Sequence, residues 1–138
     1  MPSWTKSLVA LTVLVAIAGC GGSSGGGPGG GGDQEGAVRS VMANLQAASR
    51  QGAGSQICNQ IFTPKLADSV TSSSKSGSCA KEVKAKVFSP KAKITVEDVT
   101  VSNAANAKAT IREQNGKTSN VFLVKQGDEW RVRSVKPA

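Results

Sequence analysis

The segment that sets the architecture is residues 94–133, ITVEDVTVSNAANAKATIREQNGKTSNVFLVKQGDEWRVR. Apolar residues alternate with polar ones through most of it, which is the period of a half-buried β-strand. Asn115-Gly116 and Gly127-Asp128 interrupt the alternation, and Asn-Gly between two such runs is a strong signal for a two-residue hairpin. The segment therefore predicts consecutive antiparallel strands.

The first strand carries an irregularity. Ile94 and Val96 alternate, and Val99 and Val101 continue the alternation out of phase, which predicts a β-bulge at residues 97–98.

The last strand is predicted to place Trp130 and Val132 on one face. Arg131 and Arg133 then lie on the other face, because successive side chains of a strand point to opposite sides.

Ahead of the strands, the apolar period is that of helices. Asp33 is a suitable N-cap, Gly52 and Gly54 are stop signals, and the apolar positions between them are Val38, Val41, Met42, Leu45 and Ala48. A second helical piece is expected to hold Ile57, Cys58, Ile61 and Phe62 on one side.

Thr63-Pro64 then provides an N-cap and first-turn proline for a short helix over residues 65–70. A serine-rich loop over 72–78 and a helix from Cys79 to Val87, with Val83 and Val87 as its apolar contacts, complete this half. Helices followed by a meander of strands predict the α+β class.

In this order the chain resembles the nuclear transport factor 2-like superfamily, also called cystatin-like or ketosteroid-isomerase-like, over about residues 36–136. The matching features are a helix over 37–50, a helical segment over 57–70, a bulged strand over 91–102, and the sequences VFLVK and GDEWRV near the carboxyl end. The resemblance implies amino-terminal helices packed on a curved antiparallel sheet, a cone that encloses a pocket. Small exported bacterial proteins of this family look similar, including a cysteine pair in the helical half.

The start of the chain resembles a bacterial lipoprotein precursor. Lys6 precedes an apolar run from Leu8 to Ala18, and Ile17-Ala18-Gly19-Cys20 resembles the lipobox, whose cysteine accepts a diacylglyceryl group. The apolar run is shorter than the roughly 20 residues of a membrane helix. We therefore expect a signal peptide over 1–19 and an exported protein anchored to the cell membrane or envelope by lipid, palmitate included, on Cys20. An ordinary secretory signal with a chance cysteine is the alternative.

Residues 21–32 contain Gly, Ser and Pro28 alone, a composition with nothing to bury. Residues 20–32 are thus predicted to be the lipidated cysteine and a flexible tether, with a reach of roughly 20 Å. A phosphate-binding loop would need a preceding strand and a P-loop lysine, which the sequence lacks. Residues 33–138 have the length of one compact domain.

With Cys20 assigned to lipid, the domain holds Cys58 and Cys79, an even number in an exported protein. We expect one disulfide, worth roughly 3 kcal/mol on the chain-entropy model. The rival interpretations are a redox pair or two metal ligands. The spacing is not C-x-x-C, and the sequence has no histidine to complete a zinc set.

Composition disfavours catalysis. The sequence has no histidine and no tyrosine. In ketosteroid-isomerase-like members a tyrosine donates a hydrogen bond to the oxyanion, and this chain has none to do so. Glu97 and Asp98 have no recognisable catalytic partners. We predict no catalytic, cofactor or metal site, and an isomerase- or dehydratase-like enzyme is the least favoured function.

Two binding hypotheses remain. The cone could carry a small apolar ligand in a pocket lined by Phe62, Phe122 and Trp130, although these aromatics equally suit a plain core.

Charge suggests the second hypothesis. Lys6 is the basic side chain that leaves with residues 1–19, so 16 of 17 basic side chains stay with 9 acidic ones, and the net charge falls from +8 to +7. The predicted basic surface consists of Lys81, Lys84, Lys86, Lys91, Lys93, Arg131 and Arg133, and Lys136 adds to the group near the end of the chain. We expect a noncatalytic module that contacts anionic lipid or acidic wall polymer, with a merely solvated face as the alternative. Nucleic acid is not an expected partner, because export separates the protein from it and no aromatic residues are interleaved with the basic ones.

Overall fold

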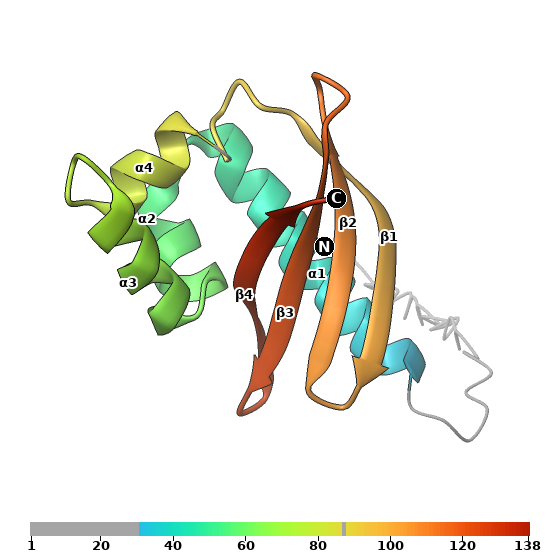
Figure 1. Ribbon diagram of the computed structural model, residues 1–138. Helices are drawn as coiled ribbons and strands as arrows, with labels where there is room; N and C mark the ends of the chain where they lie inside the picture. The colour runs from blue at the N-terminus through green and yellow to red at the C-terminus, as the bar shows by residue number, and fades with distance from the viewer. Residues whose placement is uncertain (1–30, 87) are drawn as a thin grey trace, which may run out of the picture.

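The computed structural model describes residues 31–86 and 88–138 (Figure 1). Their carboxyl-terminal half is a four-stranded antiparallel sheet in the order β1-β2-β3-β4. Its strands are β1 (Ile94–Asn103), β2 (Asn106–Glu113), β3 (Thr118–Gln126) and β4 (Glu129–Pro137). Helices precede the sheet, so the predicted α+β class is confirmed.

Glycine makes two of the tight turns possible. Gly116 between β2 and β3 has a φ of 83°, and Gly127 between β3 and β4 has a φ of 62°. Side chains with a Cβ rarely adopt this left-handed region. Both predicted turns are therefore confirmed in position. The β3–β4 loop has two residues, whereas the β2–β3 loop is longer than the two-residue hairpin that Asn115-Gly116 indicated, since the N–H of Glu113 donates to the carbonyl of Lys117.

The predicted bulge in β1 is also confirmed. The pairing of β1 with β2 shifts register between Val96 and Asp98. Ile94 and Val99 are consequently both buried, although they are five positions apart, an odd spacing that would place them on opposite faces of a regular strand. The extra residue restores the inward direction of the apolar side chains.

The amino-terminal half consists of α1 (Gly31–Gln51), α2 (Gly54–Gln56), the π-helix η1 (Ile57–Ile61), α3 (Pro64–Ser73) and α4 (Cys79–Ala85). In Figure 1, α1 runs behind the sheet, and the shorter helices lie beside it next to β4. The predicted apolar stripe of α1 faces the sheet, since Val38, Met42, Leu45 and Ala48 are buried.

Several helices begin or end at other residues than the sequence predicted. Asp33 lies within the first turn of α1 and does not precede it as an N-cap, because the helix starts at Gly31. The helix expected over 65–70 extends from Pro64 to Ser73, which shortens the serine-rich loop to residues 74–78. The helix expected to reach Val87 ends at Ala85. Val87 lies outside the described residues, and Phe88 is a buried core residue that the sequence pattern did not reveal.

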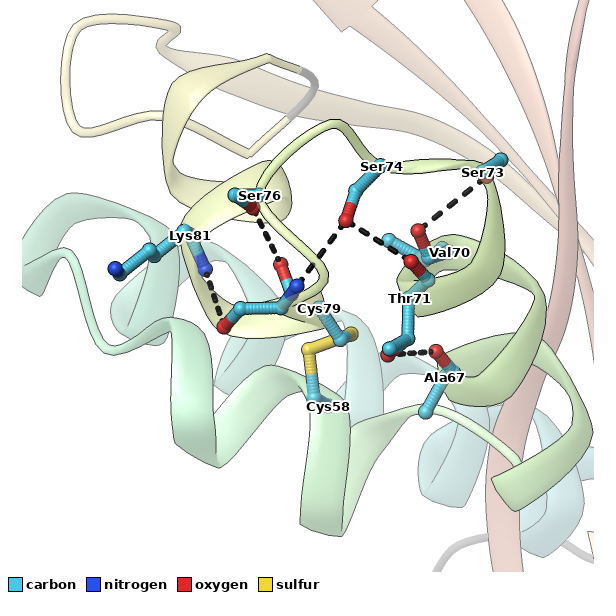
Figure 2. Close-up of a disulfide and its surroundings, with 10 residues drawn as sticks. Cys58, Ala67, Val70, Thr71, Ser73, Ser74, Ser76, Cys79 and Lys81 are labelled. Carbon is cyan, nitrogen blue, oxygen red and sulfur yellow. Dashed lines mark hydrogen bonds between the residues drawn. A yellow bond between two sulfur atoms is a disulfide. The ribbon is translucent and has the colours of Figure 1, made fainter.

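The structure joins Cys58 of η1 to Cys79, the first residue of α4, in a disulfide with a Cα–Cα distance of 6.2 Å (Figure 2). Ser74 closes the loop ahead of α4. Its hydroxyl donates to the carbonyl of Thr71 at 3.0 Å and accepts from the backbone N–H of Ser78 at 3.1 Å. The disulfide and this serine together hold α3, η1 and α4 in one unit.

The helical half joins the sheet at the edge of β4. Phe62 forms an isolated parallel bridge with Val132, and the N–H of Thr63 donates to the carbonyl of Val132 at 2.8 Å. The side chain of Thr63 caps α3 by accepting from the N–H of Leu66 at 3.2 Å, as the sequence predicted. Residues 62–63 thus cover part of an otherwise open strand edge.

Among the described residues, no helix combines the length and the apolar character needed to cross a membrane.

Candidate functional site

Part of the predicted basic surface is present on the helical side of the molecule. Lys81 and Lys84 of α4 are exposed, as are Lys91 and Lys93 in the segment between α4 and β1. We call these four residues the helix-side basic surface. Lys86 is exposed as well, but it forms an ion pair with Glu82 one turn earlier, so its charge is locally compensated.

Contacts with the end of α1 position the segments that carry these lysines. Gly52, just beyond α1, packs against Lys84 and Pro90, since a Cβ built on it would lie 3.2 Å from Cε of Lys84 and 3.1 Å from Cγ of Pro90. The hydroxyl of Ser49 donates to the carbonyl of Ser89 at 3.3 Å. The end of α1, α4 and the segment before β1 therefore meet. Arg50, an exposed cation in the last turn of α1, lies between Ser49 and Gly52, the two residues that make these contacts. Sequence reasoning did not include it in the basic surface, because the contacts form only in the folded protein.

Arg131 does not belong to an open basic surface, which corrects the prediction. Its guanidinium donates to the carbonyl of Asn59 at 3.3 Å and pairs with Glu129 at 3.0 Å, and its side chain is 23% exposed. A longer contact of 3.5 Å reaches the carbonyl of Phe62. Arg131 thus satisfies carbonyls at the end of η1 and attaches that helix to β4.

Arg133 lies elsewhere, on the side of the sheet that α1 does not cover. We call this side the outer face. There Arg133 helps to line a depression of about 320 Å³ together with Lys108 and Phe122. Lys136 reaches the same aromatic ring, with Nζ 5.8 Å from its centroid. The outer face therefore carries a second basic cluster, of which the sequence indicated Arg133 and Lys136 but not Lys108.

Arg112 of β2 is also on the sheet but is neutralised by a carboxylate. It pairs with Glu97 at the bulge of β1. The hydrogen bond that Arg112 donates to Glu97, followed by the negative charge of Glu97, raises the pKa of the Arg112 guanidinium. Arg112 consequently adds no uncompensated charge.

The three aromatic residues predicted to line one pocket do not lie together. Phe62 and Trp130 are core residues, 2% and 4% exposed, whereas Phe122 is half-buried on the outer face. Phe122 alternates with buried Val121 and Leu123, so the strand period points it away from the core. A single pocket made by these three side chains is therefore excluded.

Phe62 and Trp130 instead border different clefts. An apolar cleft of about 220 Å³ lies between α3, α4 and β4, and it is lined mainly by Phe62, Leu66, Val70, Val83, Phe88 and Val135. The rings of Phe62 and Phe88 meet edge to face with centroids 6.0 Å apart. This apolar cleft is the cavity that best matches the expected carrier site.

The larger cleft, of about 560 Å³, has a mixed lining of polar and apolar side chains. Trp130 and Ile61 lie in it, and its polar side chains are Ser40 and Asn44 of α1, Gln56 and Gln60 of the following helices, and Asp128, Glu129 and Arg131 of the β3–β4 end. Sequence reasoning missed this cleft, because its walls come from three separate segments.

Within residues 31–86 and 88–138, no three His, Cys, Asp or Glu side chains lie close enough together to hold a metal ion. Cys20 and the predicted signal peptide lie outside the described residues.

Comparisons with protein families, with curated proteins and with solved structures find no match.

Proposed function

We propose that this protein is an exported, lipid-anchored binding module of the cell envelope, with a domain of the nuclear transport factor 2-like type. The observation that carries the proposal is the sequence Ile17-Ala18-Gly19-Cys20, followed by a run of Gly and Ser that leads into α1 at Gly31. A diacylated cysteine anchors stably where a single chain is marginal. The domain is then held near a membrane surface.

The arrangement of the domain supports the family assignment. A long first helix packs on the sheet, the first strand is bulged, and the remaining strands form a meander. These features are the ones that the resemblance implies for the cone. The family assignment adds a reason to expect binding in clefts between helices and sheet, which is where the larger mixed cleft and the smaller apolar cleft lie.

The partner that charge favours is anionic. Lys81, Lys84, Lys91 and Lys93 are exposed, and none of them forms an ion pair with a carboxylate among the described residues. Near an anionic surface, each such residue contributes about 1 kcal/mol of attraction. Acidic wall polymers of the envelope carry this chemistry, and they are the partner that we assign to the helix-side basic surface.

Mass spectrometry of protein extracted in mild detergent from its own membrane tests the anchor. We expect a mass that lacks residues 1–19 and gains acyl groups, and we expect Cys20→Ser to abolish both changes. A second spectrum under denaturing conditions should gain two hydrogens on reduction of the disulfide. An unlipidated mass would refute the anchor and return the protein to the secreted or cytoplasmic classes.

Binding to an acidic wall polymer at low and high salt tests the partner. We expect salt-sensitive binding that the triple variant Lys81→Gln, Lys91→Gln, Lys93→Gln weakens, because screening and charge removal act on the same attraction. Gln substitution of Lys65, Lys75 and Lys117 removes the same charge from other exposed positions and serves as the matched control. An equal loss of polymer binding in both variants would show that net charge alone, and not the helix-side basic surface, determines binding.

A carrier of a small apolar ligand is the second candidate, favoured by the apolar cleft. Its volume of about 220 Å³ is below the roughly 300–1,000 Å³ of sites for drug-sized ligands, so the ligand would be small. We expect Val70→Arg at the wall of the cleft to abolish binding of a small fluorescent hydrocarbon probe. Val124→Arg, on a strand that does not line the cleft, should leave binding unchanged. Probe binding that survives Val70→Arg would refute the carrier function.

A further inference from the structure

We propose that the outer face of the sheet docks on an anionic lipid bilayer, with Phe122 at the centre of the contact and Lys108, Arg133 and Lys136 around it. The inference rests on the proposed function, because it takes the domain to be held at a membrane. To the proposed function, the inference adds the orientation of the domain at the membrane and the chemistry of the lipid surface that the domain contacts.

The register of the sheet assembles this face. Lys108 of β2 pairs with Phe122 of β3, which pairs with Ser134 of β4, so their side chains form one row across three strands. Lys136 pairs with Asn120 in the adjacent row, and Arg133 lies at the register shift of β3 and β4. Residues far apart in the sequence therefore share one surface.

The described helices leave this face uncovered. In Figure 1 they lie behind and beside the sheet, and the front of the sheet carries no helix among the described residues. The buried residues of β3, Val121 and Leu123, point to the α1 side, and Phe122 between them points to the front. An aromatic ring that is half-buried on an uncovered sheet face is free to contact a partner.

The charges on this face favour an anionic partner. Lys108, Arg133 and Lys136 form no ion pair with a carboxylate of the described residues, whereas the neighbouring Arg112 and Arg131 are paired. Glu97 is taken up by its pairing with Arg112. The acidic residue beside it, Asp98, forms no ion pair among the described residues and accepts a hydrogen bond from Thr100 at 3.1 Å. Three cations against one carboxylate leave an excess of positive charge around the ring.

This combination suits a bilayer better than a second copy of the chain. Two copies joined through their outer faces would bring like charges together at a dry contact, which is unfavourable. At a bilayer, by contrast, the apolar ring of Phe122 can enter the boundary between headgroups and acyl chains while long basic side chains remain among the phosphates.

The point where the chain enters the domain agrees with this orientation. Gln46 and Ser49, near the end of α1, bond to the carbonyls of Ile94 and Ser89 at or just before the start of β1. The start of α1 therefore lies toward the opposite end of β1, near the β1–β2 turn (Figure 1). Lys108 lies two residues from the start of β2, at that same end. An anchor ahead of α1 would hold this face close to the lipid surface.

The first test uses the protein as cells make it, reconstituted in vesicles of brominated phosphatidylcholine with or without brominated phosphatidylglycerol. Phe122→Trp introduces an indole at the centre of the face, and buried Trp130 is the unquenched internal reference. We expect quenching of the introduced indole with phosphatidylglycerol present and its loss at high salt. Equal quenching on neutral vesicles, or none on either, would overturn the proposal.

Two charge variants locate the contact. Lys108→Gln, Arg133→Gln, Lys136→Gln in the Phe122→Trp protein should reduce quenching to the level of neutral vesicles. Lys81→Gln, Lys91→Gln, Lys93→Gln removes the same charge from the helix-side basic surface and should leave quenching intact. The reverse pattern would assign lipid contact to the helix-side surface and overturn the proposal.

Acetylation of the wild-type protein by a water-soluble reagent provides a test that needs no variant. On phosphatidylglycerol vesicles, Lys108 and Lys136 should be protected relative to Lys81 and Lys91, and detergent should remove the protection. Protection that persists in detergent and scales with protein concentration would indicate a second copy and overturn the proposal.

The mass of the same sample separates this inference from the proposed anchor. Acylated protein without quenching or protection refutes the docking face and leaves the anchor standing. Unacylated protein with salt-sensitive quenching refutes the anchor and supports the face.

Discussion

Gly54 shows how one residue determines the packing of two helices. A Cβ at this position would overlap the carbonyl oxygen of Ala80 and would lie 3.1 Å from the Cα of Ala80. Gly54 is buried, and the obstructing atoms are backbone of α4, which cannot rotate away as a side chain would. The close approach of α2 and α4 therefore requires glycine for space, not for an unusual φ.

We predict that Gly54→Ala lowers the free energy of unfolding by about 1–3 kcal/mol, because the added methyl group overpacks a close backbone contact. Urea denaturation followed by circular dichroism measures the change. Gly36→Ala is the matched control, since Gly36 is also helical and an added methyl group there would have nothing within 4 Å. That control should be neutral or stabilising by up to about 1 kcal/mol. Equal stability of both variants would contradict the close approach.

At the scale of elements, the π-helix η1 connects to its neighbours by three different means. The disulfide links it to α4, Arg131 binds its carbonyl at Asn59, and the adjoining Phe62 bridges to β4. The N–H of Phe62 also donates to the carbonyl of Ile57 at 2.8 Å, five residues back. Wide π-turns are uncommon, and these tertiary contacts stabilise this one.

The disulfide closes a loop with a sequence separation of 21. We expect its removal to cost roughly 3 kcal/mol, because the unfolded chain regains the entropy of the open loop. Denaturation of the protein with and without reductant measures this cost. Reductant should have no effect on the variant Cys58→Ala, Cys79→Ala. A reductant-insensitive wild-type protein would show that the cysteines are not joined.

The cap of α3 gives a second test at this scale. Thr63→Val keeps the volume of the buried side chain but removes the acceptor for the N–H of Leu66, so we expect a loss of about 1 kcal/mol. Ser78→Ala removes the cap of α4, whose bond to Lys81 is longer at 3.5 Å, and should cost less. Thermal denaturation ranks the two variants. A larger loss for Ser78→Ala would contradict the geometry of the caps.

At the scale of the whole molecule, one continuous core joins helices and sheet. Its members include Met42 and Leu45 of α1, Ile57 of η1, Val83 of α4 and Trp130 of β4. No boundary divides these residues into separate cores, so the described domain is one cooperative unit.

We therefore predict a single unfolding transition. Trp130 fluorescence and far-ultraviolet circular dichroism should give the same midpoint in urea, with Trp4 replaced by Phe so that Trp130 is the sole fluorophore. Circular dichroism reports the helices and fluorescence reports the sheet. Separate midpoints would show that the helical half and the sheet unfold independently.

The elements of this fold were largely predictable because they depend on neighbours in the sequence. The bulge at residues 97–98 and the turns at Gly116 and Gly127 follow from local periodicity and turn chemistry. The predictions of helix ends were less accurate, as for α4, which ends at Ala85, because capping competes with tertiary packing. The role of Arg131 was not predictable, since its acceptor at Asn59 is 72 residues away.

The sequence by itself determined the order of helices and strands, because the apolar period of each segment is a local property. It also indicated an anchor and a basic chain. The tertiary structure alone decided which cations share a surface. Lys108 and Lys136 meet around Phe122 because the register of three strands aligns them, and register is fixed by burying the opposite face against α1.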